Sequence, residues 1–292
     1  MTVRSDRTLG RRVRASGAGT ASLRPASALA VVLGAAMAWL GMVWTPLAEV
    51  AAPIELYDTG LYRRDTPFVA GGAQGSDLLT LLAVAPAMLW SLAGPLDRMR
   101  TLVLAAGHTW LLYLAASLSL GAVAFNEAFP LYVALMPVSL AGLTLSLARL
   151  PYLPTPRWLP AFLVGCGIVT GLVWALLLFF EMAGGEYPPA SHYTSRTTYA
   201  LDLGLIAPGC IAAGLGLHRG RRRAQWLAVP LLCFAGLLLP MMALQTLMQL
   251  RAGVSFGPEA VAPFAGFGLV SGGAAWFLWR LATTEQAERA RR

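Results

Sequence analysis

The sequence predicts an all-α protein, a polytopic bundle of transmembrane helices. Three observations predict this class: hydrophobic residues make up 57% of the 292 residues, charged residues make up 12%, and the apolar residues gather in eight runs. Each run is close to the roughly 20 residues that a helix needs to cross the hydrocarbon core of a bilayer. Soluble domains carry about 25% charged residues, so most of this chain is expected in lipid.

Charge and hydropathy divide the chain into three regions. Residues 1–27 are rich in arginine and have no apolar core, which predicts a disordered cytoplasmic tail. Residues 28–281 hold the apolar runs and are expected to form an eight-helix transmembrane domain. Residues 282–292 are charged and are expected to continue the last helix into a cytoplasmic C-terminal tail.

The expected spans share a length near that of one crossing and polar connections at both ends. They are residues 28–45, 78–96, 102–125, 129–147, 158–180, 199–217, 226–250 and 261–281. Trp39 and Trp44 lie near the outer end of the first run, which has no clean cleavage site. These features favour a retained first span over a cleaved signal peptide.

The arginines indicate the orientation. When successive connections alternate between the two sides of the membrane, one side receives most of the arginines, as cytoplasmic loops do. The other side receives most of the acids and only Arg63, Arg64, Arg196 and Arg251. This asymmetry predicts an even number of spans, with both termini in the cytoplasm, in a bacterial cytoplasmic (inner) membrane.

A 4+4 parallel repeat is also expected. In each half, a long outer loop leads to a helix with an aspartate at its start, a proline inside and an arginine at its cytoplasmic end. The matched residues are Asp77, Pro86 and Arg98 in the first half, and Asp202, Pro208 and Arg219 in the second. Paired proline-interrupted spans in two halves of a transporter indicate a binding site.

The candidate ligand-binding residues lie in or beside the outer loops. They are Tyr62, Arg63, Asp65, Asp77, Asn126, Arg196, Tyr199 and Asp202. One interpretation is a polar vestibule that binds a small solute or a cation. The other is structural: Asp77 and Asp202 cap helix starts, each stabilising by about 0.3–1 kcal/mol, and the arginines pair with acids to hold the loops.

Segments around these residues resemble a broad group of bacterial multi-span integral membrane proteins. The resemblance rests on residues 61–70, 75–81, 125–126, 131–134 and 199–203, and it covers most of the chain between the tails. The chain departs from the group's pattern near Gly72 and at Ser76, where glutamine is expected. The resemblance implies the architecture and the interest of the outer-loop tyrosines, acids and Asn126, and it implies no reaction.

Several functions are excluded or disfavoured by residue type. The chain has no lysine, so a phosphate-binding loop ending in Gly-Lys-Ser/Thr and a Schiff-base lysine are impossible. His108 is the one histidine well inside a span, which predicts hydrogen-bonded packing and disfavours a haem pair. No acid is expected near the middle of the membrane, which disfavours a proton relay. No catalytic residue, metal ligand, cofactor, nucleotide or nucleic acid is predicted.

The leading functional hypothesis is binding or transport of a small solute through an outward-facing vestibule, with the lipid bilayer as the other partner. A second hypothesis is a membrane-embedded enzyme that acts on a lipid-linked substrate, with Asp65 or Asp202 as acid or base. A third is a non-catalytic subunit of a membrane complex. The solute and the oligomeric state stay open.

Overall fold

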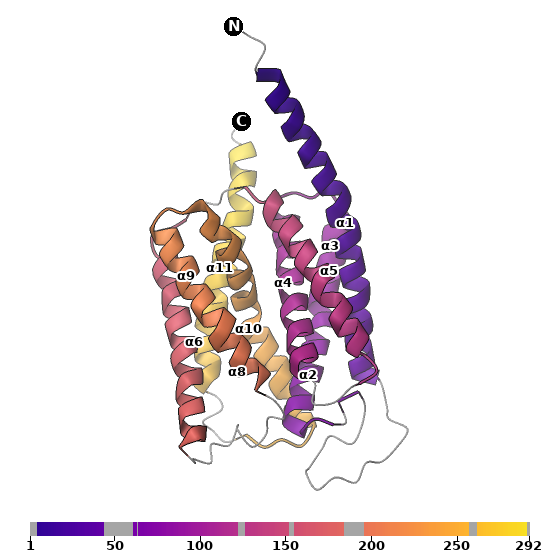
Figure 1. Cartoon of the computed structure of the whole chain (residues 1–292), viewed down its shortest axis with the longest axis vertical. Helices are drawn as coiled ribbons and strands as arrows, with labels where there is room; N and C mark the ends of the chain where they lie inside the picture. Colours follow the sequence, from indigo (N-terminus) through magenta and orange to yellow (C-terminus); the bar gives the residue numbers. More distant parts are fainter. Residues whose placement is uncertain are drawn as a thin grey trace.

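Long helices make up the structure, a computed structural model that describes residues 5–43, 61–62, 64–121, 126–151, 155–183, 196–256 and 262–290. Its α-helices are α1 (Ser5–Val43), α2 (Pro67–Leu79), α3 (Ala85–Leu92), α4 (Arg98–Gly121), α5 (Phe129–Arg149), α6 (Leu159–Met182), α8 (Thr197–Leu201), α9 (Ala207–His218), α10 (Gln225–Arg251) and α11 (Ala262–Ala290). Two π-helical segments, η1 (Thr80–Val84) and η2 (Asp202–Ile206), and a 3₁₀ turn, η3 (Arg222–Ala224), complete the described elements. Figure 1 shows that the first and last helices leave the bundle at the same end.

Seven helices of the described chain are long and apolar enough to cross a membrane. They are Ser22–Val43, Pro67–Leu92, Arg98–Gly121, Phe129–Arg149, Leu159–Phe180, Thr197–His218 and Arg222–Arg251. A further long helix, α11, packs beside α10. The predicted class, a helical protein with several helices long and apolar enough to cross a membrane, is confirmed.

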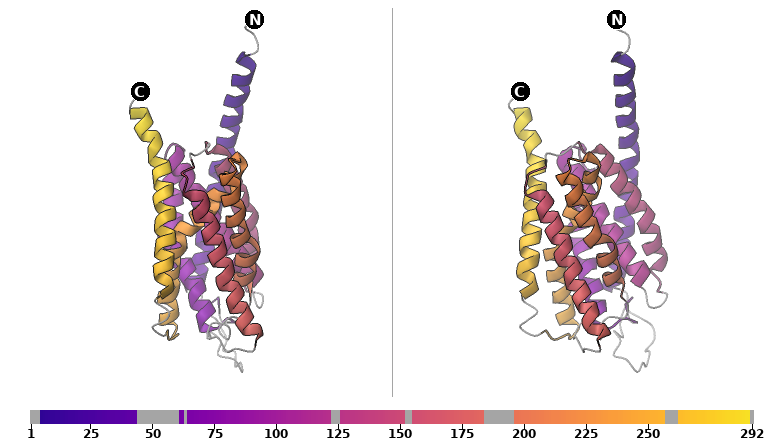
Figure 2. Two further views of the ribbon diagram at one scale, coloured as in Figure 1. Left: turned by 90° about the vertical axis from the view of Figure 1, so that its left-hand side faces the viewer. Right: turned by 60° about the vertical axis from the view of Figure 1, so that its left-hand side comes forward.

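The first helix begins earlier than the sequence predicts. Where residues 1–27 are expected to be a disordered tail, α1 already begins at Ser5. Arginine and alanine are good helix formers, which accounts for the extension. The part of α1 apolar enough for a membrane begins at Ser22, and both views in Figure 2 show α1 and α11 projecting past the other helices at the same end.

The second span also begins earlier, and this changes the place of Asp77. The sequence predicts a helix over residues 78–96 with Asp77 as its cap, but the helix begins at Pro67 with Thr66 as N-cap. Proline is favoured at the first helical position, and this signal was missed because glycine-rich residues follow it. Asp77 is therefore the eleventh of the 26 residues from Pro67 to Leu92, about 15 Å along the helix. The expectation that no acid lies near the middle of a span is wrong.

Asp202 does not cap a helix either. The sixth span begins at Thr197, with Arg196 as its N-cap residue, and Asp202 is its sixth residue. The Asp202 carboxylate lies beside the helix and accepts hydrogen bonds from other helices, as described below. Thr197 was missed as the start because the preceding residues are uniformly polar.

Both interrupted spans contain a π-helical segment directly before a proline. Pro86 follows η1 and Pro208 follows η2, each as the second residue of the next α-helix. A proline inside a helix lacks the N–H that would bond the carbonyl four residues earlier, and its ring clashes with that carbonyl. The carbonyls concerned belong to Leu82 and Gly204, which lie inside the π segments. Widening to i→i+5 bonding relieves the clash, so proline accounts for both segments.

The two π segments align residue for residue. Thr80 begins η1 six positions before Pro86, and Asp202 begins η2 six positions before Pro208. Ala85 N–H donates to the carbonyl of Thr80, and Ala207 N–H donates to the carbonyl of Asp202. By this geometry the counterpart of Asp202 is Thr80 and not Asp77, which explains why the two aspartate-to-proline spacings differ.

Helices α4 and α10 lie at the centre of the bundle. Helix α4 contacts α3, α5, α8, α10 and α11, and α10 contacts α2, α4, α9 and α11. Helix α6 packs on α9 and η2 at one side of the bundle, and α1 packs on α5, α2 and α3 at the other (Figure 1). Of the π segments, η1 packs on α4 and η2 packs on α6.

Two glycines allow α2 to approach α10 closely. A Cβ added at Gly71 would lie 2.7 Å from the Cα of Gln249, and one added at Gly75 would lie 2.6 Å from the carbonyl carbon of Leu244. The spacing of four residues places both glycines on one face of α2. The Gly-x-x-x-Gly pattern of this pair is visible in the sequence but is not among the predicted features.

We expect Gly75→Ala to lower the free energy of unfolding by about 1–3 kcal/mol, because the added methyl group must push α10 away. The measurement is reversible unfolding of the purified protein in detergent. Gly268→Ala is the control, because a Cβ there meets nothing within 4 Å in the structure. Equal stability of the two variants would contradict the close approach.

Candidate functional site

The carboxyl group of Asp77 lies inside the bundle. Asp77 is 0% exposed, and its Oδ2 accepts a hydrogen bond of 2.7 Å from the hydroxyl of Tyr62. Its other oxygen, Oδ1, is buried and has no hydrogen-bond partner. A Cβ at Gly41 of α1 would overlap this carboxyl group, so the space that Asp77 fills exists because residue 41 has no side chain.

Two further polar residues extend this contact toward the end of the bundle opposite the termini. The side chain of Tyr132, near the start of α5, lies beside that of Tyr62. The amide of Asn126 donates to Tyr132 Oη at 3.5 Å and accepts from the N–H of Ala128 at 3.1 Å. We call Tyr62, Asp77, Asn126 and Tyr132 the Asp77 cluster. Its polar side chains follow one another from a partly exposed amide to a buried carboxyl group.

Tyr62 keeps its proton in this cluster. Burial raises the pKa of the Tyr62 phenol well above its usual value, and the nearby Asp77 carboxylate raises that pKa further. A neutral phenol donates its O–H, so the direction of the Tyr62–Asp77 hydrogen bond is defined.

Asp202 lies in a different setting. Its Oδ2 accepts a hydrogen bond of 2.8 Å from the indole N–H of Trp174, and its Oδ1 accepts one of 3.2 Å from the hydroxyl of Tyr113. The rings of Trp174 and Tyr199 pack with centroids 4.5 Å apart. The guanidinium of Arg196 lies over the Tyr199 ring at 5.8 Å. We call Tyr113, Trp174, Tyr199 and Asp202 the Asp202 cluster.

Helix α4 connects the two π segments. Trp110 donates its indole N–H to the hydroxyl of Thr80 at 2.8 Å, and Tyr113 donates to Asp202. Trp110 and Tyr113 are three residues apart, about one helical turn. The first residues of η1 and η2 are therefore bound at nearly the same depth of the bundle by one central helix.

Most of the eight predicted site residues belong to the Asp77 cluster or the Asp202 cluster, or lie beside one of them. Tyr62, Asp77 and Asn126 belong to the Asp77 cluster, and Asp65 lies near enough to Tyr132 to act on it electrostatically. Tyr199 and Asp202 belong to the Asp202 cluster, and Arg196 stacks on it. Arg63 lies outside the described residues. The two aspartates thus have separate partners and do not share one set of contacts.

Four aromatic residues at these contacts are not among the predicted site residues. Tyr113 and Trp174 donate to Asp202, Trp110 donates to Thr80, and Tyr132 accepts from Asn126. Tryptophan in membrane proteins gathers at the interfaces, so Trp110 and Trp174, which lie well inside apolar helices, are unusual. A mid-span tryptophan whose N–H needs an acceptor is the signal that could have found them.

Two glutamines of α10 donate hydrogen bonds to α2. Gln245 Nε2 donates to Ser76 Oγ at 2.8 Å, and Gln249 Nε2 donates to the carbonyl of Phe68 at 2.9 Å. The Ser76 hydroxyl in turn donates to the carbonyl of Gly72 at 3.2 Å. An amide side chain is therefore present beside Ser76, supplied by another helix.

His108 packs as the sequence predicts. Its Nε2 is 2.8 Å from the hydroxyl oxygen of Ser27, and the residue is fully buried. A Cβ at Gly142 would overlap the imidazole ring. This hydrogen-bonded packing holds α1, α4 and α5 together.

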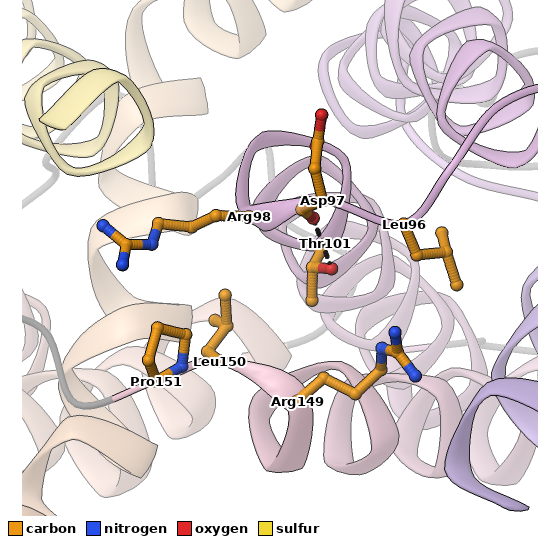
Figure 3. Close-up of a pocket in the computed structure, with 7 residues that line it drawn as sticks. All are labelled: Leu96, Asp97, Arg98, Thr101, Arg149, Leu150 and Pro151. Carbon is orange, nitrogen blue, oxygen red and sulfur yellow. Dashed lines mark hydrogen bonds between the residues drawn. The ribbon is translucent and has the colours of Figure 1, made fainter. Parts of the chain in front are cut away.

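A cavity of about 180 Å³ lies at the end of the bundle near the termini. It is lined by Leu96, Asp97, Arg98, Thr101, Arg149, Leu150 and Pro151. Figure 3 shows that the guanidinium groups of Arg98 and Arg149 point away from each other and not into a common space. The cavity therefore lacks the converging donors that an anion site needs, and we assign it no ligand. Among the described residues, no group of histidine, cysteine and acidic side chains could hold a metal ion.

The fold and the buried polar clusters define the class: a helical protein with several membrane-crossing helices and carboxyl groups in its interior. No family model, no curated protein and no solved structure matches the chain. The resemblance noted from the sequence therefore stays a prediction.

We expect Trp174→Phe and Asp202→Asn to couple by about 1–3 kcal/mol in a double-mutant cycle of unfolding free energies, because a hydrogen bond to a charged group contributes on that scale. The cycle is measured by reversible unfolding in detergent. The control cycle joins Trp174→Phe to Asp97→Asn, and Asp97 lies exposed before α4. Additive effects in both cycles would contradict the bond.

Proposed function

We propose that the protein binds a small solute and moves it across a bacterial cytoplasmic membrane. In this proposal the chain makes eight crossings, with α11 as the last, and both termini lie in the cytoplasm. The two halves form a 4+4 parallel repeat in which α2–η1–α3 and α8–η2–α9 are equivalent. The solute enters from the end where α2 and α8 begin.

The observation that carries the proposal is the pair of matched π segments. Each is followed by Ala-Pro, each begins with a residue bound to α4, and each lies in an interrupted span. Pairs of interrupted spans at corresponding positions of two halves are typical of transporter binding sites near the middle of the membrane. Single-turn π segments in helices are also frequent at functional sites.

The buried acids support the same conclusion. An intramembrane carboxylate is costly, about 2.5–3.5 kcal/mol on insertion scales, and such groups mark substrate or ion pathways. Asp77 and Asp202 both lie within membrane-length helices. We infer that both clusters contact the solute, and that η1 is the element that rearranges.

The topology predicts how two exposed positions react. In a background with Cys166, Cys210 and Cys233 replaced by alanine, Ser255→Cys should react with a membrane-impermeant maleimide in intact spheroplasts. Arg221→Cys should react only after the membrane is permeabilised, because α10 separates the two positions. Labelling of both from one side, or labelling in the reverse order, would contradict the proposed orientation.

A solute screen tests the function itself. A bound solute at a hundred times its Kd stabilises the folded state by about 2.7 kcal/mol. We expect at least one member of a broad panel of small metabolites to stabilise the purified wild-type protein, and we expect Asp77→Asn and Asp202→Asn to lose that stabilisation. Thermal unfolding in detergent is the measurement.

Asp97→Asn is the matched control for this screen, because Asp97 lies at the other end of the bundle, where its Oδ1 accepts from the N–H of Arg100 at 2.8 Å. This variant should respond to the solute as the wild type does. A solute that stabilises all three variants equally, or a panel without a stabilising solute, would overturn the proposal.

A further inference from the structure

The two buried aspartates differ in how their oxygens are satisfied. Asp202 accepts one hydrogen bond on each oxygen. Asp77 accepts one on Oδ2, while Oδ1 is buried without a partner. A carboxylate with an unsatisfied buried oxygen is strongly disfavoured, whereas a carboxyl group with a proton on that oxygen carries no charge. The Asp202 site therefore suits a fixed anion, and the Asp77 site suits a carboxyl group that binds a proton.

A route for that proton is present in the Asp77 cluster. Tyr62 is 2% exposed and Tyr132 is 0% exposed, so their hydroxyls form a contact closed to lipid and bulk water. Asn126 donates to Tyr132, Tyr62 donates to Asp77, and the two phenols lie side by side between these bonds. Tyr132 is the fourth residue of α5, and Asn126 precedes that helix, so the route begins at the loop end of the bundle.

We propose that Asp77 is a proton-binding site, loaded from the loop end of the bundle through Tyr132 and Tyr62. In the loading step, the Asn126 amide moves off Tyr132, and a hydronium ion in its place gives a proton to Tyr132 Oη. The hydroxyl proton of Tyr132 passes to Tyr62 Oη, and that of Tyr62 passes to the oxygen of Asp77 that it faces. One water molecule and a neutral carboxyl group result. The carboxyl group then turns, so that its O–H takes the position without a partner, and the two phenol hydroxyls rotate back to their first directions. Return of the proton reverses each step.

The groups around Asp77 agree with a neutral, exchangeable site. Helix α1 presents the backbone of Gly41 to the carboxyl group. The titratable groups that face it in the described structure are Tyr62 and Tyr132, and Asp65 acts on Tyr132. Helix α10, which packs on α2, contributes the uncharged Gln245 and Gln249 at that contact. The Asp77 carboxyl group thus has no positive partner among the described residues.

This inference stands on the Asp77 cluster alone and does not require that the protein move a solute. A panel without a stabilising solute would not contradict the proton-binding site at Asp77. If the proton site fails, a solute could still bind between the two clusters.

Infrared difference spectroscopy on the full-length protein in lipid nanodiscs tests the site. A protonated carboxyl group gives a C=O stretching band that a carboxylate lacks. We expect this band in the wild type near neutral pH, we expect Asp77→Asn to lose it, and we expect Asp202→Asn to keep it.

Tyr62→Phe identifies the band even if Asp77→Asn fails to fold. Loss of the Tyr62 hydroxyl removes the hydrogen bond to Oδ2, so the band should move to higher frequency. Tyr113→Phe, which removes a donor from Asp202, should leave the band in place. The absence of a protonated carboxyl band at every pH at which the protein stays folded would overturn the proposal, as would a band that neither Asp77→Asn nor Tyr62→Phe changes.

The route is tested by exchange into D₂O, which shifts the same band. We expect Tyr132→Phe to slow this shift at least about tenfold, because a broken chain raises the barrier by more than about 1.4 kcal/mol. Tyr113→Phe is the matched control and should exchange at the wild-type rate. Equal exchange in Tyr132→Phe and the wild type would overturn the route through Tyr132.

Discussion

A carboxyl group inside an apolar bundle needs hydrogen-bond donors, and this constraint connects most of the structure described above. With no water in the hydrocarbon region, an unsatisfied polar group costs several kcal/mol. The donors come from aromatic side chains of other parts of the fold: Tyr62 from the segment before α2, Trp174 from α6 and Tyr113 from α4. Each bond ties elements distant in sequence, so the acids help to fix which helices are neighbours.

The two spans that contain π segments are similar in backbone and different in chemistry. Proline at equivalent positions forces a π segment in each half, and α4 binds the first residue of each. That residue is a threonine in η1 and an aspartate in η2, while the acid of the first half lies three residues earlier, at Asp77. Because it lies three residues earlier on its helix, the acid of the first span faces α1 and Tyr62 and not α4. The result is two polar clusters with different donors.

The sequence predicts the fold class well because apolar runs of membrane length and arginine asymmetry are strong signals. It places the helix starts less well. Thr66-Pro67 is an ordinary signal for a helix start, but Gly71 and Gly75, which follow it, have low helix propensity. These glycines are explained by the close contact with α10, which the local sequence does not reveal. Of the site, the acids and Tyr62 are predictable as polar residues in an apolar chain. The donors to Asp202, Trp174 and Tyr113, are not, because which aromatic residue faces which acid depends on helix rotation and packing.

The two aspartates differ in which helices hold them, and in the proposed proton binding this difference determines which part of the bundle can move. Asp202 is held by α4 and α6 together, so η2 moves only if both bonds break. Asp77 is held by Tyr62, which belongs to the segment before α2 and not to a membrane-length helix. When Asp77 binds a proton, the carboxyl group beside Tyr62 loses its negative charge, and no hydrogen bond to α4 has to break. In this scheme the first half responds to protonation while the second stays fixed, and the hydrogen bond between Trp110 and Thr80 is the link through which a change in η1 reaches the central helix.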